Sequence, residues 1–145
     1  MGNSEWPTPT FADDFADAVS RYRVELLPWA ELRPEGVAFR EGDEVRMILW
    51  DRVVHALAAH VGEPEGVSTV VFDLVVERKD AECLVRRFDA DPGDAAQAVA
   101  RTVAEAVGRE RCSRSLLDLA AEGVASRSYS DLPSLAAGSL EDLGL

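Results

Sequence analysis

The stretch Val67–Val76 constrains the fold of this chain more than any other, because it is rich in β-branched residues and apolar on both faces. The alternating positions of one face are Val70, Phe72, Leu74 and Val76. On the other face, Thr69, Val71 and Val75 surround a single acid, Asp73. A polar turn at 77–80 follows, and residues 81–88 return as a second strand. The sequence therefore predicts a central β-hairpin at about residues 67–89, with its first strand inside a sheet.

Helical periodicity is the main pattern before this hairpin. Thr10 is a suitable N-cap, and apolar residues then recur every three to four positions as far as Leu26. Pro28 ends that pattern. We therefore expect a helix from Thr10 to Leu26, followed by a connection and a short strand at 37–40.

Residues 41–61 fit two interpretations. In the preferred one, Asp43 caps a long helix that runs to Val61 and carries an apolar stripe. In the alternative, Gly42 and Asp43 form the turn of a hairpin that pairs residues 37–40 with 45–50. A helix would then begin at Asp51.

Two more helices are predicted after the central hairpin. Asp91, followed by a proline, is a suitable cap for the first, whose stripe of small apolar residues ends at Gly108. Ser113 or Ser115 caps the second, which ends at Gly123.

With strands in the middle and helices at both ends, the sequence predicts an α+β fold. We expect a small antiparallel sheet, with the central hairpin at about 67–89, packed against N-terminal and C-terminal helices. A flexible leader at 1–10 precedes a single domain at 11–125, and 126–145 form a tail or a short helix.

The charge balance limits the classes of partner. The chain has 27 acidic and 15 basic side chains and a net charge of −12. Direct binding to nucleic acid or to an anionic membrane surface is not expected, because phosphate contacts need clustered cations. A basic protein partner or self-association fits better. The N-terminus has no basic segment followed by an apolar one, as a signal peptide would have, and Cys83 and Cys112 form no disulfide framework. We therefore expect a cytoplasmic protein. Its arginine-rich composition is typical of bacteria with GC-rich genomes.

Motifs for cofactors are missing from the sequence, so no cofactor and no metal is expected. Neither a dinucleotide-binding glycine motif nor a phosphate-binding loop is present. The acidic run at 89–94 lacks the EF-hand spacing. His55 and His60 are five residues apart, which places them on different sides of a helix. Cys112 lies among arginines, which could lower the pKa of its thiol, although a polar loop is the simpler interpretation.

Several residues remain as candidate binding residues. Asp73 interrupts an apolar strand, and if it is buried its carboxylate needs a cation, which Arg86 or Arg87 on the returning strand could supply. Asp51 and His55 are four residues apart, as in a base and the group that orients it on one helix face.

Tryptophans are the second kind of candidate. Trp29 follows the proline that ends the first helix, and an exposed tryptophan there is typical of an interface anchor. Trp50 is a further candidate anchor, although burial in the core is the simpler interpretation for both tryptophans.

These observations lead to a preferred function and two alternatives. The preferred one is a small, acidic, non-enzymatic binding module, such as an adaptor, an immunity protein or a chaperone-like protein, that recognises a basic protein. The first alternative is a ligand-binding or enzymatic domain with a pocket between sheet and helices, in which at least two of Asp73, Asp51, His55 and Arg87 converge within hydrogen-bond reach. The second is a complex component docked by its C-terminal tail, since residues 137–140 (Ala-Gly-Ser-Leu) resemble the core of encapsulin cargo-loading peptides.

Overall fold

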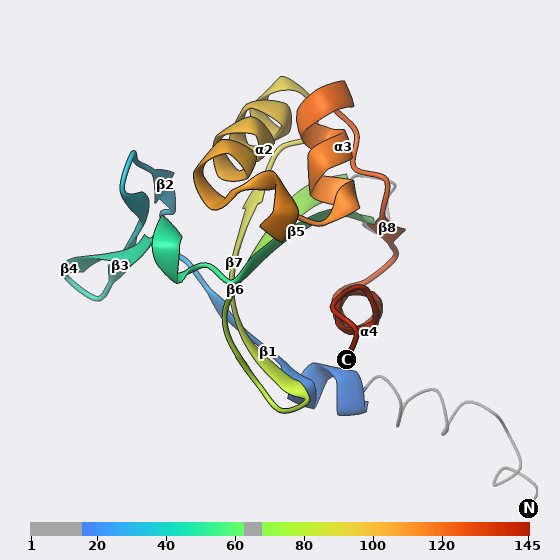
Figure 1. Ribbon diagram of the computed structural model, residues 1–145. Helices are drawn as coiled ribbons and strands as arrows, with labels where there is room; N and C mark the ends of the chain where they lie inside the picture. Colours follow the sequence, from blue (N-terminus) through green and yellow to red (C-terminus); the bar gives the residue numbers. More distant parts are fainter. Residues whose placement is uncertain (1–15, 63–67) are drawn as a thin grey trace, which may run out of the picture.

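The computed structural model describes residues 16–62 and 68–145, which form two sheets with helices on both faces of the larger one (Figure 1). Sheet A has the strand order β1 (Tyr22–Leu26), β7 (Glu82–Ala90), β6 (Ser68–Lys79), β5 (His55–Gly62) and β8 (Ser128–Tyr129). Sheet B has the order β2 (Glu31–Leu32), β3 (Gly36–Glu41) and β4 (Glu44–Leu49). The helices are α2 (Asp94–Val107), α3 (Arg114–Glu122) and α4 (Leu132–Asp142), with a helical segment at 16–21 and single 3-10 turns η2 (Trp50–Arg52) and η3 (Arg109–Arg111).

The predicted α+β class is confirmed, and so is the central hairpin, which consists of β6 and β7. Strand β6 lies in the middle of sheet A, as its two apolar faces require. Sheet A is nevertheless mixed, because β1 pairs with β7 and β8 pairs with β5 in parallel. Sheet B is the small antiparallel sheet.

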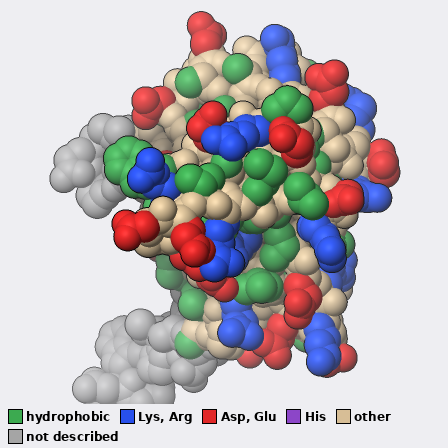
Figure 2. Space-filling model, turned by 90° about the vertical axis from the view of Figure 1, so that its left-hand side faces the viewer, with side chains coloured by type: hydrophobic (Ala, Val, Ile, Leu, Met, Phe, Trp, Pro, Cys, Tyr) green, Lys and Arg blue, Asp and Glu red, His purple; other side chains and the backbone are tan. Residues whose placement is uncertain are grey.

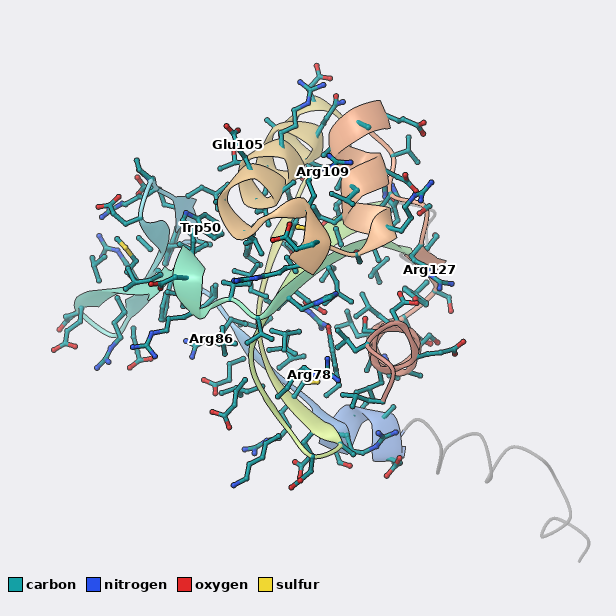
Figure 3. The ribbon with its side chains drawn as sticks, viewed as in Figure 1. Trp50, Arg78, Arg86, Glu105, Arg109 and Arg127 are labelled. Carbon is teal, nitrogen blue, oxygen red and sulfur yellow. The ribbon has the colours of Figure 1, made fainter. Side chains whose placement is uncertain are left out.

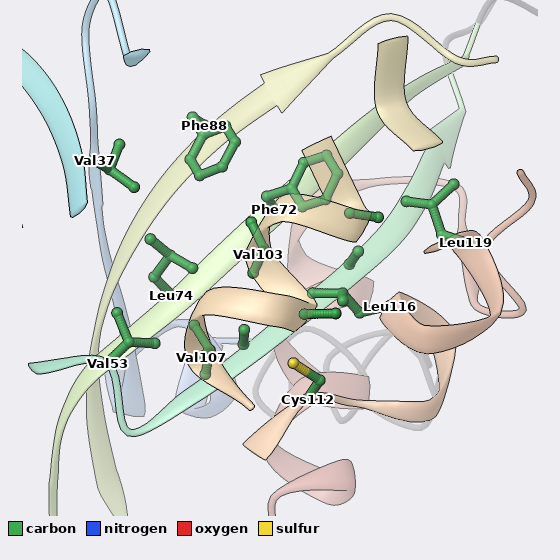
Figure 4. Close-up of a cluster of buried hydrophobic side chains, with 14 of the residues drawn as sticks. Val37, Val53, Phe72, Leu74, Phe88, Val103, Val107, Cys112, Leu116 and Leu119 are labelled. Atoms are coloured by element: carbon green, nitrogen blue, oxygen red, sulfur yellow. The ribbon is translucent and has the colours of Figure 1, made fainter. Parts of the chain in front are cut away.

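Each face of sheet A has its own hydrophobic core. On the first face, Phe72 and Leu74 of β6 pack with Val103 of α2 and Leu116 of α3 (Figure 4). Phe72 also stacks on Phe88 of β7, with ring centroids 5.2 Å apart. On the second face the buried cluster joins sheet residues to α4 and to the helical segment at 16–21. Asp73 lies on this second face, between Val71 and Val75 of β6.

The helix expected from Thr10 to Leu26 is wrong at its C-terminal end. The helical conformation ends at Arg21, and Tyr22–Leu26 form β1. The reason is tertiary, because β1 pairs in parallel with residues 83–87 of β7 and buries the Tyr22 ring to 1% exposure. The start of the expected helix, including Thr10, lies outside the described residues.

The long helix from Asp43 to Val61 is also wrong, and the hairpin alternative is correct. Gly42, with a φ of 63°, and Asp43 connect β3 to β4. The helix that the alternative placed from Asp51 is absent from this segment, where the turn η2 leads directly into β5. Strand β5 is rich in alanine, which favours helices, but its position between β6 and β8 buries both of its faces.

The C-terminal helices follow their predicted caps with one exception. Gly93 rather than Asp91 is the N-cap of α2, whereas Gly108 ends the helix as expected. Ser113 caps α3, accepting a hydrogen bond from the Leu116 N–H, and Gly123 ends that helix in the left-handed conformation. Within 126–145, the structure has β8 and α4.

Candidate functional site

A buried ion pair occupies the second face of sheet A. Strand pairing places Arg87 of β7 directly opposite Asp73 of β6. The Arg87 Nε–H donates to one carboxylate oxygen at 2.7 Å, and its Nη2–H donates to the other at 2.9 Å. The Tyr22 hydroxyl of β1 donates to the same carboxylate at 2.7 Å. Asp73 and Arg87 are 2% and 7% exposed, so three strands converge on one desolvated carboxylate.

The protonation states of this cluster follow from its burial. Burial raises the pKa of the Tyr22 hydroxyl well above its ordinary value, and the neighbouring Asp73 charge raises it further. Burial alone would lower the pKa of Arg87, but the hydrogen bonds and charge of Asp73 outweigh this, so the net shift is upward. Tyr22 is therefore neutral and Arg87 charged near neutral pH. In this cluster Arg87 is the cationic partner of Asp73, and the Tyr22 hydroxyl is a hydrogen-bond donor to the same carboxylate.

The other arginine considered as a partner for Asp73 lies on the opposite face. Arg86 is stacked over the Phe39 ring of sheet B, 4.9 Å from its centroid, and contacts Glu25 at 3.5 Å. Its Nε–H is buried and has no hydrogen-bond partner among the residues that the structure describes. Arg86 therefore joins sheet B to sheet A, and Figure 3 shows it beneath the junction of the two sheets.

Beside the ion pair, a groove of about 700 Å³ passes over the edge of β7 where β1 ends. We call it the Trp29 groove. Its lining residues are mostly apolar: Leu26, Leu27, Pro28, Trp29, Ala30, Leu32, Val61, Thr69, Val71, Arg87, Phe88, Asp89, Val99 and Leu132. Val99 belongs to α2 and Leu132 begins α4, so the groove lies between helices on opposite faces of the sheet.

Exposed side chains form the lip of this groove. Trp29 is 81% exposed, Leu26 is 70% exposed and Leu132 is 48% exposed. Trp29 also has a φ of 57°, a conformation that costs a residue with a Cβ roughly 1–2 kcal/mol. The turn is held in place because the Pro28 carbonyl accepts a hydrogen bond from the Arg40 N–H of β3 at 3.0 Å. A large apolar side chain is thus presented to solvent at an energetic cost.

Among the described residues that line the groove, the exposed charged side chain is an acid, Asp89. Arg87 is the only cation among these described lining residues, and its charge is matched by Asp73. Asp89 lines the groove and is exposed, and the exposed Asp91 and Asp94 follow where β7 leads into α2. This rim favours cationic ligands.

Of the six candidate residues, the structure brings only Trp29 and Arg87 to the groove lining, with Asp73 directly behind Arg87. Trp50 is 7% exposed, and its indole N–H donates to the Arg33 carbonyl at 3.0 Å. Figure 3 shows it where sheet B meets α2. Asp51 lies in η2 and His55 begins β5, so the helical spacing proposed for them does not exist.

The remaining candidate chemistries find no support in residues 16–62 and 68–145. Burial, and then the Glu110 charge, raise the pKa of the Cys112 thiol to about 11, opposite to the activation that its arginine neighbours suggested. His60 accepts a hydrogen bond from the Ala125 N–H at 3.3 Å. In these residues no cluster of three or more potential metal ligands is present, and no helix is long and apolar enough to cross a membrane.

Sequence reasoning missed three contributors to this site. The sequence pattern predicts Tyr22 and Leu26 on the apolar stripe of a helix, and Leu132 in the tail. Tyr22, Val24 and Leu26 alternate as the residues of a strand do, but three positions are too few to distinguish a strand from a helix.

Comparison of the chain with protein families, curated proteins and solved structures gave no match.

Proposed function

We propose that this protein is a non-enzymatic binding module that holds an apolar segment of a basic protein partner in the Trp29 groove. The observation that carries the proposal is Trp29, which is 81% exposed on the lip of an apolar groove and held there in an unfavourable backbone conformation. Exposed tryptophans beside apolar pockets are typical of interface anchors, because the indole buries a large area with little loss of conformational entropy.

The chemistry of the partner follows from the rim. Apolar side chains of the partner fit against Leu26, Trp29 and Leu132, while a Lys or Arg residue beside them meets Asp89, which lines the groove. The net charge of −12 would also increase the association rate with a cationic protein.

The test uses short fluorescent peptides that share one apolar core of leucine and valine and differ in their flanks, which are lysine, serine or glutamate. Fluorescence anisotropy should rank the affinities lysine, serine, glutamate. Trp29→Gly should weaken binding of the lysine-flanked peptide by at least about tenfold, as loss of an interface tryptophan usually does. Asp89→Asn should reduce the preference for lysine over serine.

A matched control is Val124→Ala, since Val124 is 59% exposed but lies outside the groove lining. This variant should bind as the unmodified protein does. The proposal is wrong if no peptide of the set binds, or if Trp29→Gly and Val124→Ala bind equally well.

A second candidate function is small-ligand binding, which the groove volume of about 700 Å³ favours, since pockets for small molecules span about 300–1,000 Å³. Native mass spectrometry of the purified protein separates the two functions. A small molecule retained by the unmodified protein and lost from Trp29→Gly, together with no peptide binding, would favour the second.

A further inference from the structure

Strand β4 is an edge with an unpaired side. In the part of the chain that the structure describes, β4 pairs with β3 alone. The β3–β4 hairpin projects away from sheet A (Figure 1). A strand in this position presents a row of unsatisfied N–H and C=O groups, which is a template for pairing with another strand.

The register of the hairpin shows which groups point outward. The Trp50 N–H, which follows β4, donates to the Glu35 carbonyl on the β3 side. Because backbone groups of successive residues point to opposite sides of a strand, those of Val45, Met47 and Leu49 point to the open side.

The side chains of the same three residues share one face of sheet B, because successive side chains of a strand alternate. Val45 is 59% exposed, Leu49 is 44% exposed and Met47 is half-buried. Figure 2, which views the molecule from the side of sheet B, shows hydrophobic side chains between the charged ones. An open backbone edge and an exposed apolar row therefore occur on the same strand.

We propose that two copies of the chain pair through β4 in antiparallel orientation, with Met47 of each copy at the two-fold axis. In this register Val45 lies opposite Leu49 of the second copy, and Leu49 opposite Val45 of the second copy. The three outward-pointing residues of each strand then form hydrogen-bonded pairs, and apolar side chains face one another across the whole contact.

Other two-fold registers are less favourable. A register centred on Arg46 places Leu49 opposite Asp43 of the β3–β4 turn, so that only Val45 and Met47 of each copy are paired. One centred on Val45 leaves only a short overlap, because the chain turns at Gly42 and Asp43. One centred on Ile48 moves Val45 beyond the end of the partner strand, opposite Asp51. The self-complementary apolar register is the reason for choosing a second copy as the occupant of this edge.

Charge on the hairpin does not oppose this pairing. Arg46 contacts Glu41 at 3.1 Å and Glu44 at 3.3 Å within its own chain, so its positive charge is matched. A contact limited to one strand of six residues is small for a protein interface. The dimer is therefore expected to dissociate on dilution.

The first test is sedimentation velocity over a wide concentration range. The unmodified protein should shift from monomer to dimer as concentration rises. Met47→Pro should remain monomeric, because proline removes an outward N–H that β3 does not use. The control is Val124→Lys, which changes an exposed residue outside β4, and this variant should dimerise normally. Circular dichroism establishes that each variant is folded.

The second test fixes the register by cross-linking, with the buried Cys83 and Cys112 as background. Met47→Cys should form a disulfide-linked dimer on mild oxidation. Val45→Cys should link to Leu49→Cys when the two variants are mixed, and not to itself. A monomer at every concentration, or a dimer that a folded Met47→Pro retains, would overturn the proposal. Binding of the lysine-flanked peptide is measured for the Met47→Pro variant as well. This variant should bind the peptide as the unmodified protein does, so failure of the dimer proposal can be distinguished from failure of the proposed function.

Discussion

At the scale of single residues, Asp73 shows how one buried charge shapes its surroundings. A carboxylate between Val71 and Val75 would be very unfavourable without compensation, because burial removes its hydration. The pairing of β6 with β7 places Arg87 directly opposite Asp73, and β1 contributes the Tyr22 hydroxyl. The ion pair thus ties the central strand to β7 and, through Tyr22, to the edge strand β1.

Removing one partner of this pair should be far worse than removing both. Arg87→Leu leaves the Asp73 charge buried alone and should destabilise the protein by ~3–5 kcal/mol. The double variant Asp73→Leu, Arg87→Leu should recover most of that loss, because neither charge remains. Tyr22→Phe, which removes one hydrogen bond, should cost only ~1–2 kcal/mol. Urea denaturation measures all three variants, and a double variant that is no more stable than Arg87→Leu would contradict this account.

Trp29 should make the folded protein less stable than a glycine at the same position would. Its φ of 57° suits glycine, so Trp29→Gly should unfold at an equal or higher urea concentration, with a gain of up to ~1 kcal/mol. Asp80 provides a matched comparison, since its φ is also 57° in the β6–β7 turn. Asp80→Gly should behave similarly without affecting peptide binding. A marked loss of stability in Trp29→Gly would mean that the indole packs on the fold rather than serving a partner.

The Cys112 thiol should make stability depend on alkaline pH. The folded pKa of about 11 exceeds that of an unfolded thiol, near 8.5, so folding favours the protonated form. This contribution is complete below pH 8.5 and is lost as the pH rises towards 11, by at most ~1.4 kcal/mol per pKa unit. The free energy of unfolding of Cys112→Ala should therefore decline less between those pH values. Equal slopes for the two proteins would contradict the prediction.

At the scale of elements, the sequence predicts strands and helices well where one kind of periodicity is strong. The β6–β7 hairpin follows from β-branched residues, and α2 and α3 follow from stripes bounded by Gly108 and Gly123. The segments that fail are β5 and β1. The alanines of β5 favour a helix locally, and its burial between two strands depends on pairing with distant residues.

The site was less predictable than the fold for the same reason. Asp73 and Arg87 stand out in the sequence, but their pairing depends on the hairpin register. Leu26 and Leu132 reach the groove from segments far apart in the chain. Trp29 differs from Trp50 only in tertiary position, since one follows the end of an edge strand and the other lies under α2. Periodicity contains no information on such long-range contacts.

Helix α4 should be an integral part of the fold. Its side chains Leu135 and Leu140 are each 2% exposed against the second face of sheet A. Leu140→Ala should therefore destabilise the protein by ~2–5 kcal/mol. Leu132→Ala, at the exposed start of the same helix, should cost about 0.5 kcal/mol or less. Thermal unfolding with both variants checks this difference, and similar small losses would instead indicate a segment that is available to dock elsewhere.

At the scale of the whole molecule, two apolar surfaces lie apart from the two cores. The Trp29 groove passes over the edge of sheet A, whereas the β4 row lies on sheet B. A second hollow is lined by Trp29 together with Val45 and Arg40 of sheet B, so the two surfaces adjoin at Trp29. A protein that engages a partner through one surface and a second copy through the other would present two grooves per dimer, and thereby bind a repeated partner with higher avidity.

Salt should move these two associations in opposite directions. Between copies that each carry a net charge of −12, repulsion opposes pairing, and added salt screens it within a Debye length of ~10 Å at 0.1 M. Dimerisation should therefore strengthen as sodium chloride rises. Binding of the lysine-flanked peptide relies on attraction to Asp89 and its neighbours, so it should weaken over the same range. Sedimentation and anisotropy on the same samples measure both effects, and the serine-flanked peptide should change little. If both associations weaken together, attraction between opposite charges also holds the dimer, and the apolar β4 register is wrong.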